Sequence, residues 1–168
     1  MVCVNLLGAL YGSRVALAGM MAQGYGAVYN MEGLGSDGRV IAKLGLYGAT
    51  KAALRYLDES LAKELAGSPV LVGSLRPGMV LTDMLLGEQA RSAPDWQENR
   101  RIFAILGSRV EEVVPWLARR ILENRRNGAR ISYLTTWRVM VRFAAALWRR
   151  PQEVSGGDAL NGESVDAP

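Results

Sequence analysis

The 168-residue sequence contains no histidine and a single cysteine, Cys3. Without histidine the chain cannot build a Ser–His–Asp triad or a histidine-ligated metal centre. One cysteine cannot form an internal disulfide or a cysteine-rich metal cluster. We therefore expect no metal site, and any acid–base chemistry has to come from tyrosine, lysine, aspartate or glutamate.

Cations are also absent from one end of the chain. Residues 1–150 hold all 20 cations and 12 of the 16 acids, whereas residues 151–168 hold no cation. Hydrophobic residues make up 49% of the sequence, an ordinary value for a soluble globular protein. We therefore expect one folded domain over residues 1–150 and a disordered acidic tail over residues 151–168.

Most of the cations are arginines, and they are scattered along the chain rather than interleaved with stacking aromatic residues. This pattern disfavours a nucleic-acid partner. Arginine that pairs with dinucleotide phosphates, with lipid headgroups or with solvent is the better explanation.

Long uninterrupted apolar stretches are absent as well: none reaches the roughly 18–20 residues needed to cross a bilayer. The apolar opening, Met1–Met21, contains Asn5, Ser13 and Arg14, so we expect a buried helix rather than a signal peptide. Residues 137–150 have an apolar middle flanked by tryptophan and arginine. An interface or core-facing helix is the commoner explanation of such a segment, and a helix lying on a membrane is the alternative.

Alternating short apolar runs and helical patterns indicate an α/β protein. The runs predict buried strands, and apolar residues at helical spacing predict helices between them. The sequence of elements is typical of a parallel sheet with helices on both faces. The predicted strands are residues 26–31, 70–75 and 131–134. The predicted helices are residues 5–22, 47–66, 109–124 and 136–150, with Pro115 either kinking the third helix or marking its first turn.

Tyr47 and Lys51 lie four positions apart, so on a helix their side chains share one face. The ammonium group should favour the ionised phenol and lower the pKa of Tyr47 from its usual value near ~10. A tyrosine tuned in this way can exchange a proton with a substrate oxygen near neutral pH. The pair therefore suggests carbonyl reductase chemistry.

The glycine-rich segment Gly33–Gly38 has the spacing G-x-G-x-x-G. That motif holds a pyrophosphate by opening a helix, but here residues 39–44 precede the next predicted helix, so we do not assign it to phosphate. Ser36 lies just after a predicted strand and eleven residues before Tyr47, which suits a hydroxyl that hydrogen-bonds a substrate carbonyl. A turn serine that serves the backbone is the alternative.

The loop after the second predicted strand also has an unusual composition. Pro77 removes a backbone donor and Gly78 permits an unusual turn, so the chain can wrap closely around a planar ligand. Thr82 is placed to bind an amide or to cap the next helix. Asn5, on the first predicted helix, is placed to support a polar relay to Lys51.

Taken in order, these residues resemble the short-chain dehydrogenase/reductase family over residues 1–135. The resemblance implies a Rossmann-type sheet that uses NADPH or NADH and a small-molecule substrate. The family's N-terminal half, with its glycine-rich phosphate loop, has no counterpart here, so we expect residues 1–150 to form the C-terminal half of an incomplete Rossmann domain. The matching pattern is Asn5, Ser36, Tyr47-x-x-x-Lys51 and Pro77-Gly78-x-Val80-x-Thr82.

The resemblance also implies roles for these residues. Tyr47 would donate and accept the proton, and Lys51 would lower the Tyr47 pKa and bind the ribose hydroxyls. Ser36 would orient the carbonyl, and Asn5 would complete the proton relay. The nicotinamide would be cradled by Pro77, Gly78, Val80 and Thr82.

Three segments resemble a narrower group, the chlorophyll(ide) b reductases of plants and algae: Asn30–Ser36, Tyr47–Lys51 and Arg76–Leu86. In most other family members a Ser-Ser pair stands where this chain has Glu32-Gly33. The narrower resemblance implies reduction of the 7-formyl group of chlorophyll b or chlorophyllide b in the chloroplast, at the thylakoid. Outside this group a cytoplasmic location is the expectation.

The leading hypothesis is therefore an NAD(P)H-dependent carbonyl reductase of chlorophyll breakdown. A reductase of another ketone or aldehyde is the first alternative, because the Tyr–Lys pair does not select a substrate. The second is a truncated, non-catalytic partner module. Contact with a membrane through residues 137–150, and assembly into a homo- or hetero-oligomer, are compatible with each.

Overall fold

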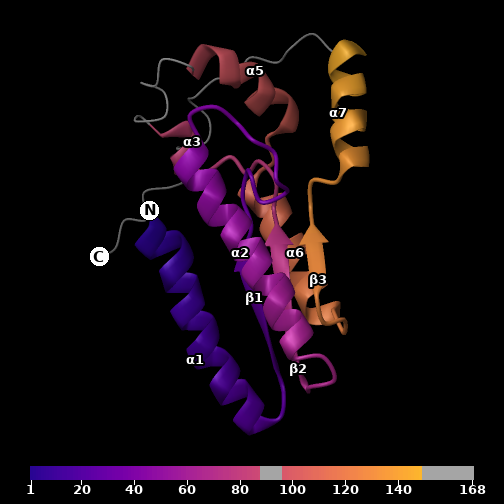
Figure 1. Ribbon diagram of the computed structural model, residues 1–168. Coiled ribbons are helices and arrows are strands. Elements are labelled where there is room, and N and C mark those ends of the chain that lie inside the picture. Colours follow the sequence, from indigo (N-terminus) through magenta and orange to yellow (C-terminus); the bar gives the residue numbers. More distant parts are fainter. Residues whose placement is uncertain (88–95, 149–168) are drawn as a thin grey trace, which may run out of the picture. The chain divides into compact units, whose positions relative to one another are not determined.

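The computed structural model describes residues 1–87 and 96–148, which divide into two compact units (Figure 1). The first unit comprises Met1–Gly78 and Glu112–Leu134. The second comprises Met79–Glu111 and the chain from Thr135 onward. The predicted acidic tail, residues 151–168, lies outside the described residues.

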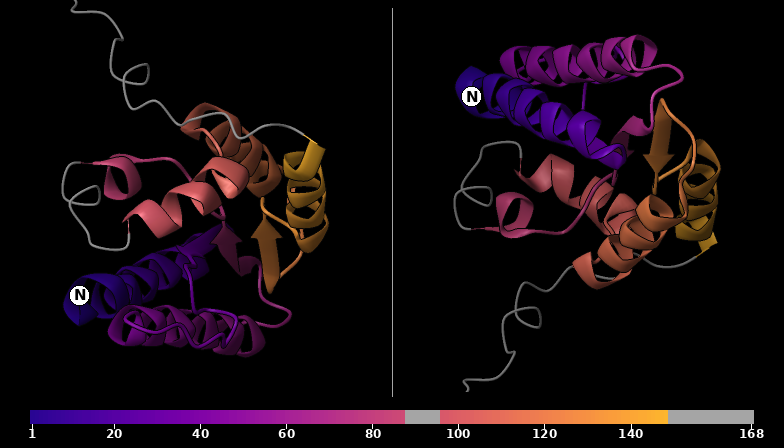
Figure 2. Two further views of the ribbon diagram at one scale, coloured as in Figure 1. Left: turned by 90° about the horizontal axis from the view of Figure 1, so that it is seen from above. Right: turned by 90° about the horizontal axis from the view of Figure 1, so that it is seen from below.

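The first unit is built on a three-stranded parallel sheet of β1 (Gly26–Met31), β2 (Val70–Arg76) and β3 (Ala129–Ser132), in the order β1-β2-β3. The predicted class, an α/β parallel sheet with helices on both faces, is confirmed. Helices α1 (Gly8–Gln23) and α2 (Gly45–Glu64) cover one face, and α6 (Val110–Glu123), from Glu112 on, covers the other (Figure 2).

The strands form where the sequence concentrates β-branched and apolar residues. Val70 and Val72 in the central strand are 0% and 1% exposed, and they pack with Leu17 of α1 and Ala62 of α2. The third strand starts and ends two residues earlier than expected. After it ends, the amide of Tyr133 still donates to the carbonyl of Arg76 at 2.9 Å.

The first helix departs from expectation. It begins with a π-helical turn, Cys3–Leu7, and only Ser13 and Leu17 of α1 are buried, although a buried helix was predicted. The described residues leave most of its apolar surface uncovered. The expectation that no stretch could cross a bilayer is wrong too: by length and composition alone, Cys3–Gln23 passes as one candidate span in the described chain.

Helix α6 contains Pro115 in its interior, with Val113 and Leu117 buried beneath it. The proline therefore does not mark the first turn of the helix, and the alternative of a kink stays a prediction. The ring of Trp116 packs edge-on against Tyr133, with 5.3 Å between ring centroids. This contact fixes the segment that follows β3.

The second unit contains α3 (Asp83–Leu86), α5 (Trp96–Leu106) and α7 (Thr136–Trp148). Of these, α7 was predicted with its bounds, and its described part ends at Trp148. A helix after Thr82 was expected only as one alternative for that residue, and α5 was not predicted. A parallel bridge joins Val80 to Ser108, with the amide of Leu81 donating to the Ser108 carbonyl at 2.9 Å. The bridge ties the start of this unit to the end of α5.

Candidate active site

Tyr47 and Lys51 occupy the first two turns of α2, next to the end of β1. The Lys51 ammonium lies 5.9 Å from the centre of the Tyr47 ring and donates a hydrogen bond to the carbonyl of Met31 at 3.0 Å. With the residues that the structure describes, the Tyr47 hydroxyl makes no hydrogen bond. A phenol and an ammonium group therefore lie close together, and both keep hydrogen-bond donors that no described residue uses.

The pKa of Tyr47 corrects a prediction. Burial raises it above the ordinary value for a phenol instead of lowering it. Burial also lowers the pKa of Lys51. Both shifts follow from the same physics, because a less polar surrounding disfavours the charged form of either group. In this structure the ammonium group lies over the ring at 5.9 Å from its centre, bonded to Met31, and does not offset the desolvation of the phenol.

Gly33 lies directly beneath the pair. A β-carbon built on Gly33 would be 2.4 Å from the Tyr47 oxygen and 3.0 Å and 3.1 Å from Cγ and Cε of Lys51. The tyrosine hydroxyl thus occupies the space that any side chain at position 33 would need. The sequence pointed to this position only indirectly, through Glu32-Gly33 standing where most family members have Ser-Ser.

Ser36 is not oriented as expected. Its hydroxyl donates to Oε2 of Glu32 at 2.6 Å, and the side chain is buried at 3% exposure. The Ser36 proton is thus used by Glu32, and the expected role of orienting a substrate carbonyl stays a prediction. The alternative of a turn serine serving the backbone does not describe it, because its partner is a carboxylate.

That carboxylate is the centre of a buried network that sequence reasoning missed. Glu32 has a fully buried side chain and forms a two-bonded ion pair with Arg130 of β3, one bond being 2.7 Å. Its Oε1 also accepts from Ser74 of β2 at 2.8 Å. Burial tends to raise the pKa of Glu32, but the bonds from Arg130, Ser36 and Ser74 outweigh it and hold this pKa low. The network joins the loop after β1 to the other two strands of the sheet, β2 and β3.

A second carboxylate holds the same loop. Asp37 accepts from Arg39 at 2.9 and 2.7 Å and from Arg76, at the end of β2, at 2.7 Å. These bonds, that from Arg39 first, hold the pKa of Asp37 far below its usual range. Arg55 of α2 adds a bond to the Ser36 carbonyl at 3.3 Å. The loop beside Tyr47 is thus tied to the sheet and to α2.

Asn5 lies in the π-helical turn and reaches α2, although not at Lys51. Its side-chain amide donates to the Thr50 hydroxyl at 3.2 Å, and that hydroxyl donates to the Tyr47 carbonyl at 2.7 Å. No hydrogen bond joins Asn5 to Lys51 in the described part of the chain. Asn5 therefore supports the backbone of the turn that carries Tyr47.

The loop that begins at Pro77 needs glycine at its second position. Gly78 has φ +82°, and a β-carbon there would be 2.4 Å from Cβ of Leu134. A side chain at this position would meet both backbone strain and a clash. Pro77 and Gly78 close the first unit, and Val80 and Thr82 belong to the second.

In the second unit, Thr82 is the N-cap residue of the short helix α3, with extended backbone and no side-chain capping bond. Its carbonyl accepts the amides of Leu85 and Leu86, each at 2.9 Å. The hydroxyl makes no hydrogen bond with a described residue. It is thus free to contact an amide, as the first alternative for this residue requires.

The polar groups around Tyr47 suit a sugar hydroxyl and a reacting oxygen. An ammonium group has three donors, and Lys51 uses one of them for Met31. The unbonded phenol adds a donor and an acceptor. This donor set fits the ribose hydroxyls of a nucleotide cofactor beside a substrate oxygen.

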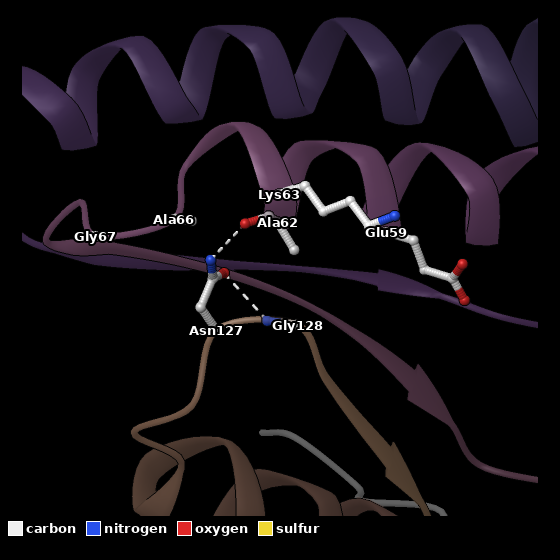
Figure 3. Close-up of a pocket in the computed structure, with 7 residues that line it drawn as sticks. All are labelled: Glu59, Ala62, Lys63, Ala66, Gly67, Asn127 and Gly128. Atoms are coloured by element: carbon white, nitrogen blue, oxygen red, sulfur yellow. Dashed lines mark hydrogen bonds between the residues drawn. The ribbon is translucent and has the colours of Figure 1, made fainter.

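The first unit also has an open pocket at the opposite, amino ends of its strands (Figure 3). There the Asn127 amide donates to the Ala62 carbonyl at 2.6 Å, while its oxygen accepts the amide of Val72 at 2.9 Å. Ligands of open parallel sheets bind at the carboxyl ends of the strands, where Tyr47 lies. We therefore do not assign the reaction to this pocket, which is lined by Glu59, Ala62, Lys63, Ala66, Gly67, Asn127 and Gly128.

Comparison with known proteins shows which family this chain is similar to. The family model for short chain dehydrogenases matches residues 1–92. A protein of Oryza sativa subsp. japonica named probable chlorophyll(ide) b reductase NYC1 is 37% identical over 151 residues, covering 89% of this chain and 29% of that protein. The chlorophyll(ide) b reductase NOL of Arabidopsis thaliana is 41% identical over 86 residues, covering 49% of this chain and 25% of that protein.

Solved structures show the same fold. A serine dehydrogenase complexed with NADP+ superimposes with a TM-score of 0.65 at 22% identity, covering 82% of this chain and 55% of that one. A 3-oxoacyl (acyl-carrier-protein) reductase from Agrobacterium tumefaciens with NADP bound gives a TM-score of 0.63 at 30% identity, covering 78% and 52%. The chain thus spans about half of these structures and less than a third of the two curated relatives.

Proposed function

The chain belongs to the short chain dehydrogenase family, and we propose that Tyr47 and Lys51 form the reacting pair of an NAD(P)H-dependent carbonyl reductase. One observation supports this most strongly. An unbonded phenol and an ammonium group with spare donors lie together at the carboxyl end of a parallel strand, in the family's spacing. No other described part of the chain combines these groups in that position.

In the proposed reaction the reduced nicotinamide supplies a hydride to the carbonyl carbon. The Tyr47 hydroxyl gives its proton to the oxygen as that oxygen gains negative charge, which yields an alcohol and the oxidised nucleotide. Because the raised pKa keeps Tyr47 protonated at neutral pH, the residue is a proton donor in the resting state. Solvent returns the proton after product leaves.

Lys51 is proposed to hold the ribose hydroxyls with the donors that Met31 leaves free. Pro77 and Gly78 are proposed to contact the nicotinamide. For Val80 and Thr82 the same proposal rests on the family pattern alone, and the unbonded Thr82 hydroxyl is compatible with an amide contact. Asn5 is proposed to support the Tyr47 turn through Thr50 rather than to relay protons directly.

For the substrate we propose the 7-formyl group of chlorophyll b or chlorophyllide b. The support is the similarity to proteins named chlorophyll(ide) b reductase, at 37% and 41% identity over the aligned residues. Both are named chloroplastic, and we propose the chloroplast for this chain, with peripheral contact to the thylakoid and assembly with like or unlike subunits.

The test is incubation of the purified chain with NADPH or NADH and chlorophyllide b, in parallel with a panel of small ketones and aldehydes. The proposal predicts conversion of the formyl group to hydroxymethyl that requires NADPH or NADH and is abolished by Tyr47→Phe. If the chain reduces a small ketone or aldehyde in preference to chlorophyllide b, the reductase activity stands and the proposed substrate is wrong. Failure of a folded chain to bind either nucleotide would instead support a non-catalytic partner module.

A further inference from the structure

Helix α7 presents a continuous apolar surface that no described residue covers. Its outward side chains share one side of the helix, because their positions recur every three or four residues. We call this surface the α7 face. Its members and their exposed fractions are Trp137 71%, Met140 58%, Val141 46%, Phe143 44%, Leu147 88% and Trp148 94%.

The packing of α7 against α5, within the second unit, determines which side looks outward. Arg142 donates to the carbonyl of Leu106, the last residue of α5, at 2.7 Å and to that of the following Gly107 at 3.0 Å. These bonds satisfy carbonyls that a helix end leaves open. With Arg142 held there, the α7 face points away from α5.

The charge of α7 itself has one sign. The helix carries two arginines, Arg138 and Arg142, and no acid. Exposed tryptophan stands at both ends of the face, and indole rings favour the boundary between a hydrocarbon layer and water. Aromatic ends, an apolar middle and excess cations match an anionic lipid surface.

The dimensions disfavour a second copy of the chain as the occupant. A helix of 13 residues is roughly 20 Å long and about 10 Å wide, so one face offers on the order of 200 Å². A stable protein interface buries roughly 800 Å² per partner. Binding to a bilayer does not require an interface of that area, because each aromatic or apolar side chain inserts among the lipids separately.

We propose that the α7 face is a peripheral membrane-binding surface that lies in the headgroup region of an anionic bilayer. The inference deepens the membrane contact in the proposed function by naming the surface and the lipid class. It requires no catalytic turnover.

The experiment measures binding of the full chain to vesicles of phosphatidylcholine with and without phosphatidylglycerol, by co-sedimentation and tryptophan fluorescence. Leu147→Glu with Trp148→Glu tests the α7 face. Val4→Glu with Val15→Glu, on the first helix, is the matched control, because those side chains are 77% and 74% exposed and the added charge is equal. Circular dichroism verifies that each variant folds.

We expect binding to the anionic vesicles with a blue shift of tryptophan emission, weakened at least roughly tenfold in the α7 variant and retained in the control. Higher salt should weaken binding, because it screens the arginines. The proposal is overturned if the chain binds neither kind of vesicle, or if only the control variant loses binding. It is also overturned if the α7 variant changes a dimer to a monomer and still binds the vesicles as tightly as the native chain. Nucleotide binding and reduction are measured in separate assays, so a failure to bind lipid would leave the reductase proposal unchanged.

Discussion

Replacing Gly33 by alanine should disturb the Tyr47–Lys51 pair directly. The new methyl group would start 2.4 Å from the Tyr47 oxygen, about 1 Å inside ordinary contact. The backbone at Gly33 is not left-handed, so the substitution adds a clash without backbone strain. The phenol therefore has to move by about 1 Å.

The cost to stability should be modest and the cost to reaction large. Overpacking a core costs ~1–3 kcal/mol, and we expect the lower end because a side-chain tip can rotate away. About 1 kcal/mol lowers the Tm of a domain of this size by ~2–4 °C. Displacing a reacting group by about 1 Å can lower turnover ~100-fold. Thermal unfolding and NADPH-dependent reduction measure the two effects.

A double-mutant cycle identifies the clashing atom. In a Tyr47→Phe background the oxygen is gone and the nearest contacts are the 3.0 and 3.1 Å approaches to Lys51, so Gly33→Ala should cost less than half as much. Gly12→Ala is the control, because nothing lies within 4 Å of a β-carbon there. Equal costs in both backgrounds, or no cost in the native one, would refute the proposed packing.

Three further outcomes follow from the buried carboxylates. Arg130→Met should lower the free energy of unfolding by ~3–5 kcal/mol in urea, because it leaves the buried Glu32 carboxylate without its cation; an unchanged midpoint would contradict the network. Ser36→Ala should lower stability by ~1.5–3 kcal/mol while turnover stays within a few-fold, and a ~100-fold loss of turnover would restore the carbonyl-orienting role. Burial raises the pKa of Asp58 from 3.8 to about 6, so its favourable contribution is present below pH 3.8 and is lost as pH rises to about 6. Asp58→Asn should flatten that part of the stability profile, and an unchanged slope would show that another group titrates.

The fold was predictable because its signals are local. The strands at Gly26–Met31 and Val70–Arg76 are short apolar runs, and α2 follows helical spacing. The exposed side of α1 was not predictable, since an apolar helix has the same periodicity whether or not a partner covers it. Helix α5 was not predicted, although its apolar residues recur on one side of the helix.

The site was predictable only where sequence spacing is also spatial spacing. Tyr47 and Lys51 meet because one helix carries both. The partners of Glu32 come from residues 4, 42 and 98 positions away, and only the folded sheet brings them together. The direction of the Tyr47 pKa shift likewise depends on burial, which no pair of sequence positions reveals.

The central claim is that Tyr47 protonates a carbonyl oxygen while a nicotinamide reduces its carbon. Single-turnover reduction of chlorophyllide b with NADPH deuterated at the reacting C4 position tests both halves in one product analysis. The account predicts one deuterium on the new hydroxymethyl carbon and a yield at least ~100-fold lower with Tyr47→Phe. Undiminished deuterium transfer by a folded Tyr47→Phe chain would contradict it.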